Sequence, residues 1–425
     1  MKIIRYPHKK DWPLLCERPV IDTRVLEQHV GKILYDVKEQ GDRAVHNYTA
    51  LFDKVNTQVL EVTQQEFEDA ERVCPSALKM AMQLAKRNIE LFHASQKEQE
   101  IDVEVMPGVN CWRKSVAIEK LGLYVPGGSA PLFSTVLMLG IPAQLAGCKD
   151  IFLCSPPNKN GQVDSSILVA ARLVGIQTVF KVGGAQAIAA MAYGTETIPR
   201  VYKIFGPGNQ YVMAAKQLVN KTGTATDLPA GPSELAVLAD QSCVPSFVAA
   251  DLLSQAEHGE DSQVILVSDN EVVISEVLQE LQQQVAVLPR KSIALKVLEN
   301  SNAILVKDLS EGMDLLNAYA PEHLILACAN EVELAQKVVN AGSVFLGNYS
   351  CESAGDYVSG TNHTLPTNGH AKAQSGVSLD SFVKKITFQK ITRVGLAAMA
   401  PAIETMAEAE GLIGHGKAVS IRLKN

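Results

Sequence analysis

The chain has 425 residues, more than one hydrophobic core usually organises, so we expect two or more domains. Its net charge of −7 gives no electrostatic reason to bind nucleic acid or an anionic membrane. No secretory signal and no apolar run long enough to span a bilayer is evident. The eight cysteines are scattered and form no Cys-x-x-Cys pair. This cysteine pattern predicts a reducing compartment, by default the cytoplasm.

The first hundred residues predict helices. Residues 22–40 place apolar side chains at helical spacing, and Pro75-Ser76 opens another long helix that runs to about Ser95. From Ile101 the pattern changes to alternation around a Pro107-Gly108 turn, which predicts a hairpin.

Two blocks of alternating strands and helices follow. The first predicts strands at 121–125, 150–154, 178–182, 201–205 and 234–238, and the second at 263–268, 303–306, 323–327 and 343–346. This alternation implies right-handed βαβ units and parallel sheets, so the fold class is α/β. We expect the two blocks to divide near residues 233–240.

The loops that leave the first strands are rich in glycine and proline. They lie at 126–129, 155–157, 183–184 and 206–209. Ligands of open α/β sheets bind at the carboxyl ends of the strands, where such loops admit a pyrophosphate. None of them is G-x-G-x-x-G, so the pattern predicts an edge that tolerates phosphate without a nucleotide fingerprint.

The tail after about Gln374 departs from both blocks. It predicts a strand at 386–389, a helix at 394–410 and a last strand at 418–423. A tail outside both domains needs a surface to pack on, and an arm over a partner subunit would provide one.

Candidate chemistry begins with the sequence SQAEHG at 254–259. A helix that starts near Pro245 and stops near Gly259 would project Gln255 and His258 from one face, as half of a metal site. The alternative is an ordinary helix-capping or surface histidine.

Two further segments place carboxylates beside histidines. Glu322 and His323 stand where a helix ends and a strand begins, which suits proton transfer, although an exposed turn would look the same. The polar, glycine-rich segment 351–363 favours an active-site loop over a linker. Glu410 and His415 flank a glycine turn near the terminus, where a frayed end is the alternative.

Gln255, His258, Asp356 and His415 together form a mixed nitrogen and oxygen ligand set. Such a set suits Zn²⁺, with Mn²⁺ or Co²⁺ as substitutes. The residues come from three separated segments, so spacing alone does not establish the site.

Seven motifs occur in a fixed order along the chain. They are YVPGGSAPLF at 124–133, GGAQA at 183–187, FGPGN at 205–209, PAGPSE at 229–234, SQAEHG at 254–259, PEHL at 321–324 and SAGDY at 353–357. With these motifs the chain resembles the histidinol dehydrogenase family over nearly its whole length.

The resemblance implies a zinc-dependent oxidation of L-histidinol to L-histidine through the aldehyde, with two NAD⁺. It also implies roles for residues. Gln255, His258, Asp356 and His415 would hold zinc, and Glu322 and His323 would transfer protons. The substrate would contact Ser233, Glu410, His323 and the zinc ligands. NAD would contact Tyr124, Gln186 and Asn209. The family is a homodimer whose tail crosses to the partner, so Glu410 and His415 would complete the other subunit's site. His363, in the same loop as Asp356, would be a further proton carrier or only a loop anchor, and we expect it to line the site without a role.

We therefore expect two Rossmann-like parallel-sheet domains with a helical N-terminal region and a C-terminal arm. The divisions are an N-terminal extension at 1–20, a domain with metal and catalytic residues at 21–120 and 234–373, an NAD-binding domain at 121–233, and a dimerisation arm at 374–425. Glycines on both sides of His415 depart from the family pattern and would loosen the arm. A metal-dependent hydrolase and a non-catalytic metal-stabilised scaffold stay open as alternatives from the residues alone.

Overall fold

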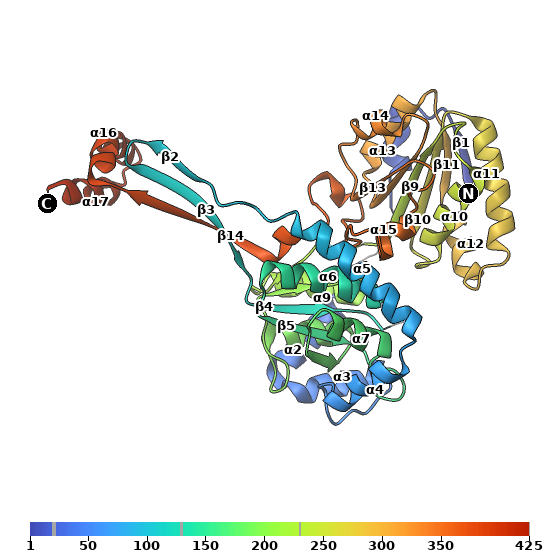
Figure 1. The fold of residues 1–425 in the computed structure, drawn as a ribbon, viewed down its shortest axis with the longest axis horizontal. Helices are drawn as coiled ribbons and strands as arrows, with labels where there is room; N and C mark the ends of the chain where they lie inside the picture. Colours follow the sequence, from blue (N-terminus) through green and yellow to red (C-terminus); the bar gives the residue numbers. More distant parts are fainter. Residues whose placement is uncertain (19–22, 128–130, 229–230, 425) are drawn as a thin grey trace.

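A computed structural model describes residues 1–18, 23–127, 131–228 and 231–424. Two of the seven motifs, at 124–133 and 229–234, therefore lie partly outside the described residues. The chain forms two rounded lobes and a long arm that projects from them (Figure 1). The strands of the described ranges form three sheets, of which two are parallel and one is antiparallel.

The first lobe, here the large-sheet lobe, is built on a parallel sheet in the order β1-β11-β10-β9-β12-β13. Its strands are β1 (Lys2–Arg5), β9 (Glu234–Ala239), β10 (Gln263–Ser268), β11 (Asn302–Leu305), β12 (His323–Ala327) and β13 (Ser343–Leu346). Its helices are η1 (Lys9–Asp11), α1 (Trp12–Leu15), α10 (Pro245–Ala256), α11 (Glu271–Val285), α12 (Lys291–Glu299), α13 (Leu309–Tyr319), α14 (Glu331–Ala335), α15 (Glu352–Tyr357) and η2 (His370–Lys372). Strands β9, β10 and β12 are buried throughout because helices cover both faces of the sheet.

The second lobe, here the small-sheet lobe, is built on a parallel sheet in the order β6-β5-β4-β7-β8. Its strands are β4 (Lys120–Tyr124), β5 (Asp150–Ser155), β6 (Thr178–Lys181), β7 (Lys203–Phe205) and β8 (Ala225–Thr226). Its helices are α2 (Thr23–Gln40), α3 (Asp42–Phe52), α4 (Gln64–Val73), α5 (Ser76–Ala94), α6 (Phe133–Ala146), α7 (Ser165–Leu173), α8 (Gly184–Tyr193), α9 (Gln210–Asn220) and η3 (Leu379–Phe382). The predicted α/β class with two parallel sheets is confirmed.

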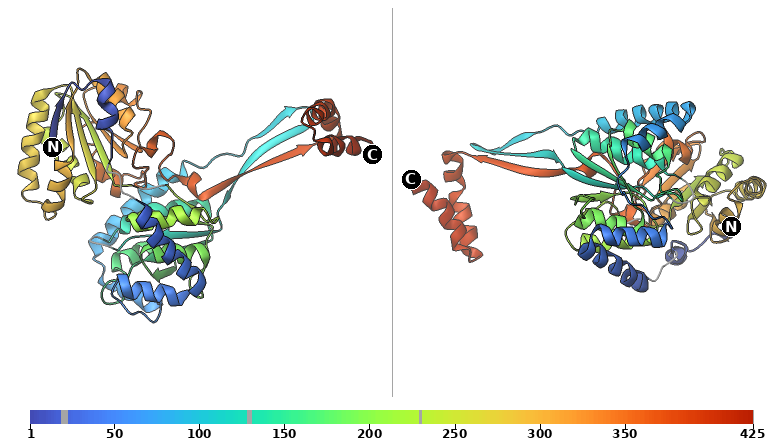
Figure 2. Two further views of the ribbon diagram at one scale, coloured as in Figure 1. Left: turned by 180° about the vertical axis from the view of Figure 1, so that it is seen from behind. Right: turned by 90° about the horizontal axis from the view of Figure 1, so that it is seen from below.

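The arm joins a hairpin to the C-terminal segment. Its elements are β2 (Asp102–Met106), β3 (Val109–Ala117), β14 (Val383–Ile391), α16 (Arg393–Ala409) and α17 (Ile413–Lys424). The strands form an antiparallel sheet in the order β14-β3-β2, and the two helices sit at its far end (Figure 2). The hairpin turn needs Gly108, which has φ +78° and whose added Cβ would meet the side chain of Thr392. The predicted hairpin and the helix near 394–410 are confirmed.

The predicted strand at 418–423 is wrong, because these residues belong to helix α17. Alternation over six residues suggested a strand, but α16 offers α17 a surface on which to pack, and Val419 is buried there. Packing on a neighbouring helix overrides so short a pattern.

The domain division also differs from the prediction. Helices α2 to α5 contact α6 to α9 and so cover the small sheet, instead of joining residues 234–373. Val30, Ile33 and Val37 of α2 enter the same core as helix α8. Residues 2–5 form edge strand β1 of the large sheet and are no mere extension. The arm is likewise wider than residues 374–425, because it includes the hairpin at 102–117. The sheet on which an apolar helix face packs depends on long-range contacts, which the periodicity of the sequence does not predict.

In the part of the chain that the structure describes, no helix is both long enough and apolar enough to cross a membrane.

Candidate active site

The predicted proton-transfer pair lies at the amino-terminal edge of the large sheet. His323 is the first residue of β12 and pairs in register with Leu235 of the neighbouring strand β9. Glu322 and His323 are both buried, with 6% and 4% of their surfaces exposed. The helix-to-strand junction that the sequence predicted is present between α13 and β12, but it is an interior junction, which excludes the exposed-turn alternative.

The backbone of Glu234, where β9 begins, orients both side chains. The Glu234 N–H donates to Oε2 of Glu322 (2.9 Å), and the Glu234 carbonyl lies 3.2 Å from Nδ1 of His323. A carbonyl only accepts, so Nδ1 carries a proton, and in the neutral form of the ring the acceptor lone pair would be on Nε2. Nε2 is buried and has no hydrogen-bond partner among the described residues.

Three carboxylates surround His323. Nδ1 lies 3.8 Å from Oε2 of Glu322 and 3.7 Å from Oε1 of Glu352, and Nε2 lies 3.6 Å from Oδ1 of Asp356. Burial alone would lower the pKa of His323, but the carboxylates, Glu322 above all, raise it above its ordinary value. Burial raises the pKa of Glu322 and of Glu352. Groups with such displaced pKa values in one place are typical of a site for proton transfer.

A possible metal site adjoins this pair. His258, Glu352 and Asp356 offer ligand atoms that all lie within 4.8 Å of one another. Helix α10 ends next to them, at Ala256, and the partial negative charge of a helix C-terminus also favours a cation. The amide atoms of Gln255 are buried without a hydrogen-bond partner within the described ranges, as expected of a side chain that awaits a ligand. One imidazole nitrogen with carboxylate and amide oxygens fits Zn²⁺ or Mn²⁺.

Gln255 and His258 hold different positions from those expected. Helix α10 begins at Pro245 as predicted but ends at Ala256, so Gln255 is inside the helix and His258 lies beyond it. The His258 N–H still donates to the Gln255 carbonyl (3.2 Å), which keeps the two residues adjacent. His258 is exposed on this chain, whereas Gln255 is fully buried.

The two predicted tail residues lie apart from this cluster. Glu410 caps the C-terminus of α16, and exposed His415 is in α17, both at the far end of the arm (Figure 1). The chain therefore does not bring its own His415 to Asp356. Ser233 directly precedes β9, and its carbonyl accepts from the Gln263 N–H (3.1 Å).

Sequence reasoning missed two contributions. Glu352 is four residues before Asp356 on α15, and this spacing on one helix face was the available signal. Arg18 makes a two-pronged ion pair with Glu234 (2.5 and 2.9 Å), donates to the Tyr319 carbonyl (2.8 Å) and covers the Tyr319 ring. It thereby fixes the segment whose backbone holds the proton-transfer pair, and no local pattern indicates so distant a contact.

His363 connects Asp356 to the other lobe. Its Nδ1 donates to the Asp356 carbonyl (2.9 Å), which leaves Nε2 to accept from the Thr135 hydroxyl on α6 (3.2 Å). Both ring nitrogens are thus engaged, and burial lowers the pKa of His363. This side chain anchors the α15 segment.

A second candidate site is a pocket of about 440 Å³ at the carboxyl ends of the small-sheet strands. The three residues expected to contact NAD line it together: Tyr124 ends β4, Gln186 is in α8 and Asn209 precedes α9. The Tyr124 hydroxyl accepts from the Gly184 N–H (3.1 Å). Both amide atoms of Gln186 are buried and lack a hydrogen-bond partner in the described part of the chain. Tyr124 and proline rings beside these polar groups suit a nucleotide.

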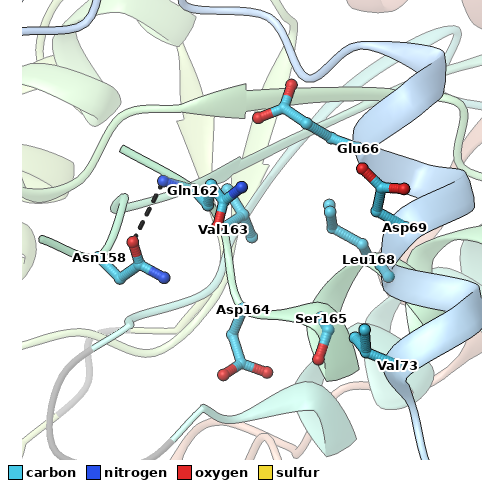
Figure 3. A pocket seen from close by; sticks show the side chains of 10 residues that line it. Glu66, Asp69, Val73, Asn158, Gln162, Val163, Asp164, Ser165 and Leu168 are labelled. Carbon is cyan, nitrogen blue, oxygen red and sulfur yellow. Dashed lines mark hydrogen bonds between the residues drawn. The ribbon is translucent and has the colours of Figure 1, made fainter. Parts of the chain in front are cut away.

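Another hollow lies between α4 and the loop that precedes α7 (Figure 3). Its polar groups already have structural tasks. Glu66 caps α4 and pairs with Lys181 (3.1 Å), Asp164 caps α7, and Asn158 accepts from the Gln162 N–H (3.2 Å). This hollow therefore offers no unused chemistry.

The fold and the two sites define the class of protein. One parallel sheet carries buried acid–base groups beside a possible metal site, and the other carries a pocket at the edge where α/β sheets bind nucleotides. These are the features of an α/β oxidoreductase that uses a dinucleotide.

Comparisons with known proteins identify the family. The profile of the histidinol dehydrogenase family matches residues 16–423. The chain is 59% identical to histidinol dehydrogenases of Bacteroides thetaiotaomicron, over 423 residues, and Bacteroides fragilis, over 424 residues; each match covers 100% of this chain and 99% of the relative. The crystal structure of histidinol dehydrogenase from Elizabethkingia anophelis matches with a TM-score of 0.98 and 54% identity, over 100% of this chain and 98% of that one.

The chain therefore belongs to the histidinol dehydrogenase family and is an NAD-dependent oxidoreductase. This assignment decides against the hydrolase and scaffold alternatives.

Proposed function

We propose that the chain catalyses the last steps of histidine biosynthesis, the oxidation of L-histidinol to L-histidine through L-histidinaldehyde. The observation that carries the proposal is the buried Glu322–His323 pair beside a possible metal site in a chain 59% identical to histidinol dehydrogenases. When bound, NAD⁺ supplies an electron acceptor for each of two oxidations, and zinc supplies a Lewis acid for the substrate's nitrogen atoms.

His323 accepts the hydroxyl proton of the alcohol at Nε2. The Glu234 carbonyl holds Nδ1 in its protonated form, so the same nitrogen is presented in every turnover. The aldehyde must next take up water before it can be oxidised again, and Glu322 removes the proton from that water. Burial raises the pKa of Glu322 and so makes its carboxylate a stronger base.

Zinc would be held by Gln255, His258 and Asp356, with His415 as the fourth ligand. Glu352 lies close enough to serve as a further ligand or to orient His323. Ser233, Glu410 and the metal would contact the substrate. An imidazole group of histidinol that reaches the metal would favour this alcohol over alcohols that lack one.

His415 and Glu410 would come from a partner subunit in a homodimer. Two features support this arrangement. Both residues stand on the far end of an arm that projects from the lobes (Figure 1). The arm also exposes large apolar side chains, which a partner would cover: Val394, Met406, Ile413 and Ile421 are each more than half exposed. The expected cytoplasmic location stays a prediction of the sequence.

The proposal is tested with the substitution His323→Asn. Loss of the proton acceptor should reduce NADH production from histidinol by about 100-fold to 10,000-fold while zinc content is retained. His8→Asn, an exposed histidine whose side chain makes no capping bond, is the matched control and should leave turnover unchanged. A zinc-loaded native protein that forms no NADH from histidinol and NAD⁺ would contradict the proposal.

A further inference from the structure

Asp53 lies on the wall of the small-sheet pocket. It follows helix α3, and its backbone N–H donates to the Thr49 carbonyl (2.9 Å), which ends the helix. Its Oδ2 is buried and has no hydrogen-bond partner among the described residues. The nearby cation Lys54 is engaged elsewhere, because its Nζ donates to the Leu51 carbonyl (2.7 Å). A buried acceptor without a donor is unfavourable for folding unless a ligand supplies the donor.

The pocket wall around Asp53 is otherwise uncharged. Its described lining consists of Ile33, Phe52, Asp53, Tyr124, Pro126, Gly127, Pro156, Gly184, Ala185, Gln186, Asn209 and Tyr211. Asp53 is the one charged side chain in that set. The wall therefore combines rings that can contact a base or a sugar with a carboxylate that only accepts hydrogen bonds. A ligand that suits this wall brings neutral donors, such as a pair of hydroxyls, to the position of Asp53.

We propose that Asp53 accepts hydrogen bonds from the adenosine ribose hydroxyls of NAD and disfavours the 2′-phosphate of NADP. This inference rests on the proposed use of NAD at this pocket and names its specificity residue. A 2′-phosphate would meet the carboxylate, and the described lining offers no cation to balance the added charge. Carboxylates commonly bind the ribose 2′-hydroxyl in dinucleotide sites, whereas arginine accommodates a 2′-phosphate.

Gln186 reinforces the assignment. Its two side-chain amide atoms are also buried and have no hydrogen-bond partner among the described residues. Gln186 lines the same pocket as Asp53. A carboxylate needs donors, and an amide needs one donor and one acceptor. A sugar hydroxyl both donates and accepts and so can meet both needs, whereas a purely apolar ligand would satisfy neither.

Calorimetry with the full chain tests the inference without turnover. The probes are ADP-ribose and ADP-ribose 2′-phosphate, and the variants are Asp53→Asn and Asp53→Ala. Asp69→Asn on α4 is the control, because Asp69 lines the other hollow. A charged hydrogen bond is worth enough for Asp53→Asn to weaken ADP-ribose binding by about 10-fold to 100-fold. The native preference for ADP-ribose over its 2′-phosphate should shrink by at least about 10-fold, and Asp69→Asn should change neither value.

A comparison of two ligands on the native protein does not depend on whether the variants fold. Native protein should bind ADP at least about 10-fold more tightly than 2′,3′-dideoxy-ADP. Equal affinities for these two ligands, or ADP-ribose binding unaltered by Asp53→Asn, would overturn the assignment of Asp53 and leave the proposed function standing. Native protein that binds neither ADP-ribose nor NAD⁺ would overturn both.

Discussion

The two parallel sheets use opposite edges for their sites. The small sheet follows the usual rule, because its pocket lies beyond the carboxyl ends of β4 and β7, where glycine-rich loops admit a ligand. In the large sheet, Glu234 and His323 begin β9 and β12, so the acid–base groups gather at the amino ends. That edge also receives the C-terminus of α10, whose partial negative charge favours a cation.

The difference in edges matches a difference in chemistry. The small-sheet pocket is largely uncharged apart from Asp53, whereas the large-sheet site packs several ionisable groups around His323. One lobe is thus suited to bind a dinucleotide and the other to hold a metal and move protons. If this separation holds, a change in one lobe should alter one property and spare the other.

Asp356→Asn should produce the largest separation of the two properties. Loss of this proposed zinc ligand should reduce bound zinc and lower turnover by about 1,000-fold or more, because a metal Lewis acid contributes several kcal/mol. ADP-ribose affinity, measured by calorimetry, should stay native. Asp314→Asn, an exposed aspartate on α13 that pairs with Lys9, is the control within the same lobe. Equal loss of ADP-ribose affinity in Asp356→Asn would show that the two lobes do not act separately.

Subunit mixing tests which chain completes the large-sheet site. His323→Asn and His415→Asn are each expected to be nearly inactive. Co-expressed with different tags, they should recover about a quarter of native activity, because half of the dimers are mixed and each mixed dimer has one intact site. No recovery in purified mixed dimers would show that His415 acts within its own chain.

Arg18→Ala should have an intermediate effect. Removal of one partner of the buried Arg18–Glu234 pair should lower the free energy of unfolding by about 3 kcal/mol. Turnover should fall by about 10-fold, with little change in the KM for NAD⁺, because Arg18 orients the β9 segment and not the pocket. Arg5→Ala, which breaks the exposed pair with Glu271, is the control and should change stability by less than about 1 kcal/mol. A changed NAD⁺ affinity with native turnover would contradict this assignment.

The weakening of ADP-ribose binding at low pH should be the smallest of these effects. Burial raises the pKa of Asp53 to about 6, so its carboxylate is ionised above that pH and loses acceptor capacity below it. Of the titratable groups that interact with it, the Tyr124 hydroxyl is neutral in this range, since burial raises the pKa of Tyr124 to about 12. ADP-ribose affinity should weaken several-fold from pH 7 to pH 5, and Asp53→Asn should remove this dependence. The same pH slope in both proteins would exclude Asp53 as its source.

The raised pKa of Asp53 also sets the sign of its effect on stability. A carboxyl whose pKa is higher in the folded than in the unfolded chain stabilises the fold at low pH and loses that contribution as pH rises through about 6. Asp53→Asn should therefore keep or raise the Tm at pH 7, which separates a binding role from a structural one.

Much of the fold could be predicted because its signals are local. Apolar runs such as 234–238 and the glycine loops after β6 and β7 indicate parallel strands and their edge. Long-range choices could not be predicted in the same way. The packing of α2 to α5 on the small sheet depends on matching surfaces, and the helical state of 413–424 depends on α16. The residues of PEHL and SQAEHG indicated chemistry, but Glu352 and Arg18 reach the site only through tertiary contacts.

The stoichiometry of NADH formation tests the central claim most directly. Histidinol in limiting amount, with excess NAD⁺ and zinc-loaded protein, should yield two NADH and one histidine for each histidinol consumed, as followed by absorbance and amino-acid analysis. One NADH with release of the aldehyde, or no NADH at all, would contradict the account of a large-sheet site that moves protons in two successive oxidations.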